Sequence, residues 1–194
     1  MKQPQTLESE AAFEGVGNPA TSHPRFRPGR VVGIDPGLTV TGYAVVEPSS
    51  AGPRIAEAGV IRPFSACGSL GRRLAHLHRE LVDLLDSFPP AAVALERVHS
   101  HLRFPRTAIL MAHARGVIVL AAATRGIPVF GYAPAQVKKT LTGSGRAPKA
   151  QIQHAIMTEL RLSQIPQPHD VADACALALC HFQTRRTLEA FQGF

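Results

Sequence analysis

The chain has 194 residues, of which 45% are apolar and 18% charged, and its formal net charge is +7. This length and composition are typical of one globular domain with a sizeable core, and they exclude a chain that is disordered throughout. The positive charge favours a polyanionic partner, nucleic acid or anionic lipid, but charge alone does not choose between them.

Cysteine usage and hydropathy exclude two further classes of protein. Cys67, Cys175 and Cys180 form no Cys-x-x-Cys pair, so neither a disulfide framework nor a structural zinc site is indicated. The longest apolar run, 116–124, is far below the ~20 residues that a membrane-spanning helix needs. We therefore expect a cytoplasmic protein that does not contact a membrane.

The first segment, residues 1–30, is rich in Pro, Ser, Thr and Glu and has no apolar period, which predicts a disordered N-terminal extension. It contains acidic residues and no continuous apolar stretch, so it fits neither a secretory signal nor a transit peptide. A single folded domain is expected over 31–186, and a flexible tail over 187–194.

From Val31 onward, short apolar segments closed by turn residues alternate with longer segments of helical period. The Asp-Pro-Gly turn indicates that the first two strands form a hairpin. Strands are predicted at 31–37, 39–47, 54–63, 91–96 and 127–132. Helices are predicted at about 70–85, 105–126, 134–141, 148–160 and 169–185. This order predicts an α/β fold with a mixed sheet, because the leading hairpins are antiparallel and the later strands need helical crossovers.

Two carboxylates stand at the ends of predicted strands, Asp35 after the first and Glu96 after the fourth. Burying a carboxylate beside a sheet core is costly unless a cation compensates it, and open α/β sheets place ligand-binding groups at the carboxyl ends of strands. The alternatives are that Asp35 only starts the turn and that Glu96 is an exposed strand terminus.

Two more acids, Asp170 and Asp173, begin the last predicted helix and lie on one face of it. An acid at a helix N-terminus caps free N–H groups, so one of the two needs no further explanation. If all four acids converge, they repel one another unless divalent cations lie among them. Oxygen ligands select Mg²⁺ or Mn²⁺ over zinc, and two such ions support phosphodiester hydrolysis.

Three motifs carry a resemblance: GIDPGLTVTGY (33–43), ALERV (94–98) and HDVADACALALCH (169–181). Together with their spacing, they resemble the RuvC family of Holliday-junction resolvases, and the similarity runs from about Val31 to Phe182. The resemblance implies a ribonuclease H-like mixed sheet of five strands flanked by helices. It also implies a Mg²⁺- or Mn²⁺-dependent crossover junction endodeoxyribonuclease of DNA recombination and repair, in which the four acids are the catalytic, metal-binding residues.

The resemblance further implies the partners and the DNA contacts. A homodimer is expected to nick two opposed strands of a four-way junction, with RuvA and RuvB as branch-migration partners. The apolar helix over 107–124 is the candidate dimer surface. Lys138 and Lys149 match basic family residues that approach the scissile DNA, whereas without the resemblance they are better explained as solvated helix lysines.

Two places depart from the family pattern. Some members have His where this chain has Asp170, and here His169 directly precedes it; we take Asp170 as the ligand and His169 as a candidate for proton transfer. Relatives often place an aromatic wedge three residues after the second acid, where this chain has His99. Either His99 or Phe104 is then the candidate for base stacking, with Arg103 and Arg106 on phosphates.

Two other functions stay open on the sequence alone. An ATPase or other nucleotide hydrolase of the same architecture would need a duplicated second half, for which the chain is too short. A non-catalytic protein that binds branched DNA would keep the fold and lose cleavage, but the presence of all four acids argues against that loss.

Overall fold

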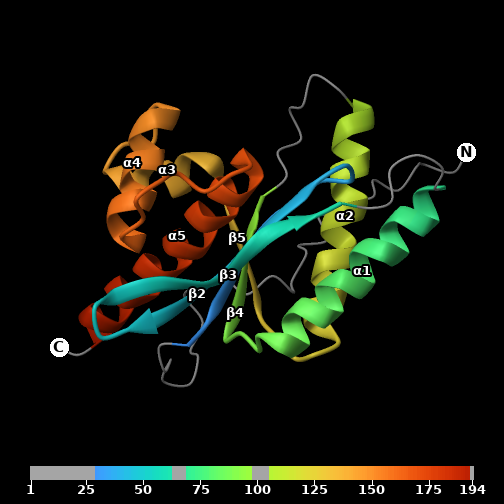
Figure 1. Ribbon diagram of the computed structural model, residues 1–194, viewed down its shortest axis with the longest axis horizontal. Coiled ribbons are helices and arrows are strands. Elements are labelled where there is room, and N and C mark those ends of the chain that lie inside the picture. Colours follow the sequence, from blue (N-terminus) through green and yellow to red (C-terminus); the bar gives the residue numbers. More distant parts are fainter. Residues whose placement is uncertain (1–28, 63–68, 98–104, 193–194) are drawn as a thin grey trace, which may run out of the picture.

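The computed structural model describes residues 29–62, 69–97 and 105–192, with the backbone alone at 105–106 and 188–192 (Figure 1). The strands are β1 (Val31–Asp35), β2 (Thr41–Ser49), β3 (Gly52–Ile61), β4 (Ala92–Glu96) and β5 (Val129–Tyr132). The helices are α1 (Leu70–Ser87), α2 (Pro105–Ala123), α3 (Pro134–Thr142), α4 (Lys149–Leu160) and α5 (His169–Gln192).

The five strands form one mixed sheet in the order β3-β2-β1-β4-β5. The chain enters as an antiparallel meander, in which β1 pairs with β2 and β2 with β3. It then crosses over through α1 to place β4 parallel to β1, and through α2 to place β5 parallel to β4. β1 and β4 are therefore central parallel neighbours, and their carboxyl ends lie at the same edge of the sheet.

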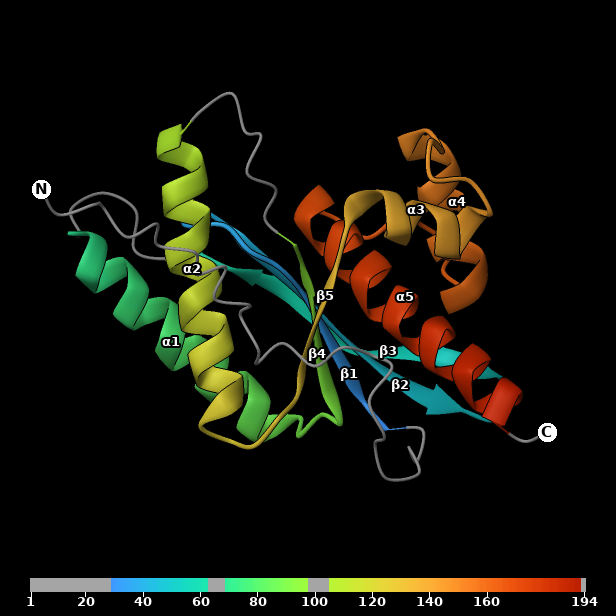
Figure 2. The ribbon, with the colours of Figure 1, turned by 180° about the vertical axis from the view of Figure 1, so that it is seen from behind.

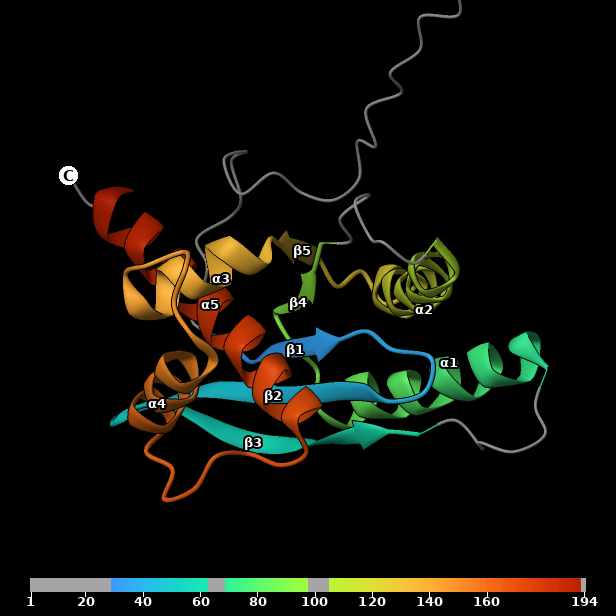
Figure 3. The ribbon, with the colours of Figure 1, turned by 90° about the horizontal axis from the view of Figure 1, so that it is seen from above.

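Helices cover both faces of the sheet, with α3, α4 and α5 on one side and α1 and α2 on the other (Figures 2 and 3). Alternate side chains of each strand enter opposite cores, so that Val31 faces α5 whereas Val32 and Ile34 face α1 and α2. Because β1 and β4 are buried on both faces of the sheet, their sequences are apolar almost throughout.

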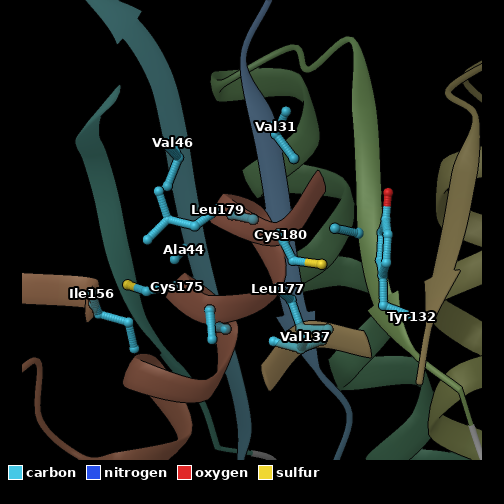
Figure 4. Close-up of a cluster of buried hydrophobic side chains, with 14 of the residues drawn as sticks. Val31, Ala44, Val46, Tyr132, Val137, Ile156, Cys175, Leu177, Leu179 and Cys180 are labelled. Carbon is cyan, nitrogen blue, oxygen red and sulfur yellow. The ribbon is translucent and has the colours of Figure 1, made fainter. Parts of the chain in front are cut away.

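Helix α5 is the centre of the first core, where Leu177, Leu179 and Cys180 pack among Val31, Ala44 and neighbouring side chains (Figure 4). It lies unusually close to β1, because a Cβ atom at Gly33 would sit 2.1 Å from the carbonyl oxygen of Ala174. Glycine is required there by the close approach of the two backbones.

The predicted order of strands and helices and the mixed sheet are confirmed. The predicted end of the last helix near Arg185 is wrong, because α5 continues to Gln192 and takes in most of the segment expected to be a flexible tail. Residues 1–28 of the extension predicted at 1–30, and the predicted DNA-contact residues His99, Arg103 and Phe104, lie outside the described residues. Within the described ranges, no helix is long and apolar enough to cross a membrane.

Candidate active site

Asp35 and Glu96 end the two central parallel strands, β1 and β4, as the sequence predicts. Both are partly buried, after strand residues that are fully buried. Ile34 pairs with Leu95 at the last step of the ladder, so the two acids follow directly at the same edge. The fold therefore brings together carboxylates that are sixty-one positions apart in the sequence.

The start of α5 brings the other two acids to this edge. Asp35 pairs with Gly42 in β2, and a Cβ at Gly42 would lie 2.1 Å from the carbonyl oxygen of Asp170 and 2.9 Å from its Cβ. The missing side chain of Gly42 thus lets the first turn of α5 rest on the sheet beside Asp35. The role of this glycine was not recognised in the sequence, although it lies in the first family-like motif.

The loop that follows Asp35 is held by internal hydrogen bonds. The Thr41 hydroxyl is fully buried, donates to the carbonyl of Gly37 at 2.5 Å, and accepts from the Gly37 N–H at 3.3 Å. Arg73 of α1 donates to the carbonyl of Leu38. These bonds fix the chain on both sides of the loop, which limits the positions available to Asp35.

The electrostatics show that the four acids form one group. Burial raises the pKa of Asp35 to about 7, and the negative charges of Asp173, Glu96 and Asp170 contribute to the rise, in that order. Each of the three predicted partners therefore lies within electrostatic range of Asp35. A carboxyl with such a pKa is only half ionised at neutral pH unless a positive charge approaches it.

Lys149, the first residue of α4, supplies such a charge. It lowers the pKa of Asp35 and that of Asp173, although burial leaves the pKa of Asp173 raised overall. The lysine side chain is exposed, and it stands beside the acids while remaining open to solvent. Lys138 lies on α3 and is partly buried, and it does not contribute to either shift.

His169 lies at the outer side of the group. Its Nε2 atom is 3.8 Å from an Asp170 carboxylate oxygen, and its side chain is 68% exposed whereas that of Asp170 is 22% exposed. His169 also lowers the pKa of Asp173 when it is charged. The imidazole is therefore next to the carboxylates and accessible to a substrate.

A basic surface adjoins the acids on α3, α4 and the turn between them. The segment from 134 to 160 has one acidic residue, Glu159, and its basic residues are Lys138, Lys139, Arg146 and Lys149, besides His154. Lys139, Arg146 and Lys149 are exposed. Such a surface beside a carboxylate group suits a polyanion whose backbone is brought to the acids.

The four carboxylates fit a divalent cation in their chemistry, because their oxygen atoms are hard ligands and their mutual repulsion is relieved by positive charge. In the described part of the chain, no group of three or more His, Cys, Asp or Glu side chains has the arrangement that holds a metal ion.

Among the remaining predicted residues, Arg106 lies in the first turn of α2, and its side chain is not described. The loop residues of 98–104 that were expected to contact DNA also lie outside the described ranges. Arg115, which donates to the carbonyl of Glu96, was not singled out in the sequence; its position in an apolar helix was the one available signal.

The sheet order and the carboxylates at its edge place the chain in the ribonuclease H-like class of α/β proteins. A solved structure of Thermus thermophilus RuvC superposes with a TM-score of 0.75 at 34% identity, covering 81% of this chain and 96% of that one. The yeast mitochondrial Holliday junction resolvase Ydc2 shares the fold, with a TM-score of 0.66 at 16% identity over 88% of this chain and 85% of that one.

Sequence comparison then gives the family. The family model described as crossover junction endodeoxyribonuclease RuvC matches residues 31–181. The protein of that name from Rhodopirellula baltica is 51% identical over 79% of this chain and 88% of its own, and that from Pelotomaculum thermopropionicum is 42% identical over 78% and 91%. The chain belongs to the RuvC family.

Proposed function

We propose that this protein is a metal-dependent endonuclease that resolves Holliday junctions by paired symmetric nicks in recombination and repair. The observation that supports this most directly is the group of four acids around Asp35 in a chain of the RuvC family. The Thermus thermophilus relative has been solved in complex with a Holliday junction substrate, which supports a four-way junction as the substrate here.

Asp35, Glu96, Asp170 and Asp173 are the proposed ligands of the cation, Mg²⁺ or Mn²⁺, with two ions in each site. Such ions lower the pKa of a water and stabilise the leaving oxygen during displacement at phosphorus. The carboxylates hold the cations at the sheet edge, and burial around Asp35 keeps competing water away from that side of the site.

Lys149 and His169 are proposed to act on the substrate. Lys149 is exposed beside the acids, so its ammonium group can contact a phosphate oxygen next to the scissile bond while it moderates the charge of Asp35 and Asp173. A water oxygen forms the new bond to phosphorus and releases its proton to solvent, while the bond to the leaving sugar oxygen breaks and that oxygen takes up a proton. His169 is the proposed donor of this proton, because it is exposed beside Asp170.

The other DNA contacts follow from the positions of the basic residues. Lys138 is proposed to bind the phosphate backbone from α3, and Arg103 and Arg106 to bind it from the segment after β4. Either His99 or Phe104 is proposed to stack on a base at the crossover. All of these proposed contacts lie within the predicted nuclease domain at 31–186.

A homodimer is proposed as the active form, since two symmetric cuts need a two-fold enzyme. The apolar surface of α2 supports it, because Ile109 and Leu120 are 56% and 54% exposed and Leu110 is exposed at 38%. RuvA and RuvB are proposed as partners on the basis of family membership.

The test is incubation of the purified protein with a labelled four-way junction and with a linear duplex of the same sequence, with Mg²⁺ or with a chelator. We expect symmetric nicks in the junction that disappear with the chelator and in the Asp35→Asn variant. Binding of the junction without cleavage in Mg²⁺ or Mn²⁺ would instead support a non-catalytic protein that binds branched DNA.

A further inference from the structure

Arg115 lies in the middle of α2, on the face of the sheet opposite to α5, yet its guanidinium group reaches the active-site edge. Its Nη1 atom donates to the main-chain carbonyl of Glu96. The side chain is partly buried. Its pKa is lowered overall, by burial first and then by the charge of Arg97, while the charge of Glu96 opposes this change. Arg115 therefore lies within electrostatic range of Glu96, a proposed metal ligand.

The hydrogen bond forms at the end of β4, where this strand no longer pairs with β1. β4 runs one residue beyond its last pairing with β1, which joins Ile34 to Leu95. On the β5 side, Glu96 pairs with Tyr132, and the Arg97 N–H donates to the Tyr132 carbonyl at 2.9 Å. Arg115 thus holds the peptide bond between Glu96 and Arg97, at the end of β4. The orientation of this peptide bond limits the direction of the Glu96 side chain.

The neighbouring strand leaves room for this contact. A Cβ at Gly131 of β5 would lie 3.1 Å from Cγ of Arg97, 3.3 Å from its Nε, and 3.4 Å from Nη2 of Arg115. Both arginine side chains therefore pack over the position where Gly131 has no side chain. The sheet and α2 together fix the guanidinium group, rather than leaving it in solvent.

A second arginine from the same side of the sheet contacts the loop that follows β1, the other central strand. Arg73 of α1 donates to the carbonyl of Leu38, in the loop that follows Asp35. Arginines from both helices of this layer thus hold main-chain carbonyls beside the two acids that end β1 and β4. Charge-assisted hydrogen bonds of this kind are stronger and more directional than neutral ones.

We propose that Arg115 is a positioning residue that orients Glu96 for cation binding and cleavage. This inference rests on the proposed function. Because a displacement of about 1 Å in a catalytic group lowers rates by about a hundredfold, loss of the Arg115 bond is expected to slow cleavage by roughly ten- to a hundredfold. Junction affinity should change little, since the guanidinium group is committed to the protein.

The experiment compares the wild type with Arg115→Ala and Arg125→Ala. Arg125 is a matched control just past the same helix, where it pairs with the exposed Asp86 through bonds of 2.7 and 2.9 Å. Four quantities are measured: the single-turnover cleavage rate at saturating protein, junction affinity in chelator, Mn²⁺ affinity by calorimetry, and the melting temperature.

For Arg115→Ala we expect the slower cleavage, a several-fold weaker Mn²⁺ affinity, an unchanged junction affinity and partial recovery of rate with millimolar guanidinium. For Arg125→Ala we expect wild-type cleavage and Mn²⁺ affinity. The inference is overturned if Arg115→Ala cleaves and binds Mn²⁺ as the wild type does, if only its melting temperature changes, or if it loses junction affinity alone. If the wild type fails to cleave, the proposed function fails, and the Mn²⁺ affinities still decide the role of Arg115.

Discussion

At the scale of single residues, the raised pKa of Asp35 makes stability depend on pH. Its pKa rises from 3.8 to about 7 on folding, chiefly through burial. Between these pH values the folded protein binds more protons than the unfolded chain, so without metal its stability falls as pH rises through this window. The loss by neutral pH is at most about 4 kcal/mol.

We therefore expect Asp35→Asn to raise the melting temperature of the metal-free protein at pH 7 or above while abolishing cleavage. Near pH 4 the two proteins should melt at similar temperatures. Thermal unfolding in chelator from pH 4 to 8 measures both. A variant that is less stable than the wild type at pH 8 would show that Asp35 is not under electrostatic strain.

His181 has the opposite dependence on pH. It is fully buried on α5, where its Nδ1 lies 2.7 Å from the Tyr132 hydroxyl, and burial followed by the charge of Arg185 lowers its pKa from 6.5 to about 4. The unfolded chain takes up a proton between these pH values and the folded protein does not, so stability falls as pH falls from 6.5 to 4.

This effect amounts to at most about 3 kcal/mol, and the Asp35 effect, of similar size and opposite sign, offsets most of it over the same range. The measurement therefore uses an Asp35→Asn background. We expect denaturant unfolding to show a clear loss of stability between pH 6.5 and 4 in that protein and a smaller one after His181→Gln. Equal losses in both would exclude His181 as the cause.

At the scale of elements, the approach of α5 to the sheet determines where Asp170 and Asp173 lie. Any side chain at Gly42 meets the Asp170 backbone, which cannot yield without moving the first turn of α5. We expect Gly42→Ala to lose several kcal/mol of stability, as overpacked sites do, and to reduce cleavage at least a hundredfold.

The matched control is Gly71→Ala in α1, where the added Cβ meets nothing within 4 Å. This change should leave cleavage intact and leave stability unchanged or slightly raised, since alanine is the better helix former. Unfolding curves and cleavage rates of the two variants separate steric exclusion from a general effect of replacing glycine. Normal cleavage by Gly42→Ala would contradict the close approach.

The strands and helices could be predicted from the sequence because each one depends on a pattern of apolar residues within its own segment. Two-sided burial makes β1 and β4 continuously apolar, and leucines of α1 recur on one face. The late end of α5 was missed, since no glycine or proline marks a stop before Gly193. The positions of Asp35 and Glu96 followed from strand ends, whereas the roles of Gly42 and Arg115 depend on contacts between distant segments that no local pattern contains.

At the scale of the whole molecule, the exposed apolar residues of α2 are expected to join two copies of the chain. Ile109→Lys with Leu120→Lys should convert a homodimer into a folded monomer, because both side chains are exposed in the single chain and little of its own core is disturbed. Leu70→Lys, at another exposed apolar position on α1, is the control.

Sedimentation measures the mass of each variant, and junction cleavage measures the consequence. We expect the double variant to be monomeric and to lose paired nicks, and the control to remain dimeric. A dimer of unchanged affinity in the double variant would place the interface elsewhere on the molecule.

The central claim is that Asp35, Glu96, Asp170 and Asp173 form one cation site at the edge of the sheet. Anomalous diffraction from crystals soaked in Mn²⁺ tests it directly. The account predicts anomalous peaks in contact with these four carboxylates in the wild type, weakened or lost in Asp35→Asn. Saturating Mn²⁺ that binds only elsewhere, or that binds the variant in the same way, would contradict it.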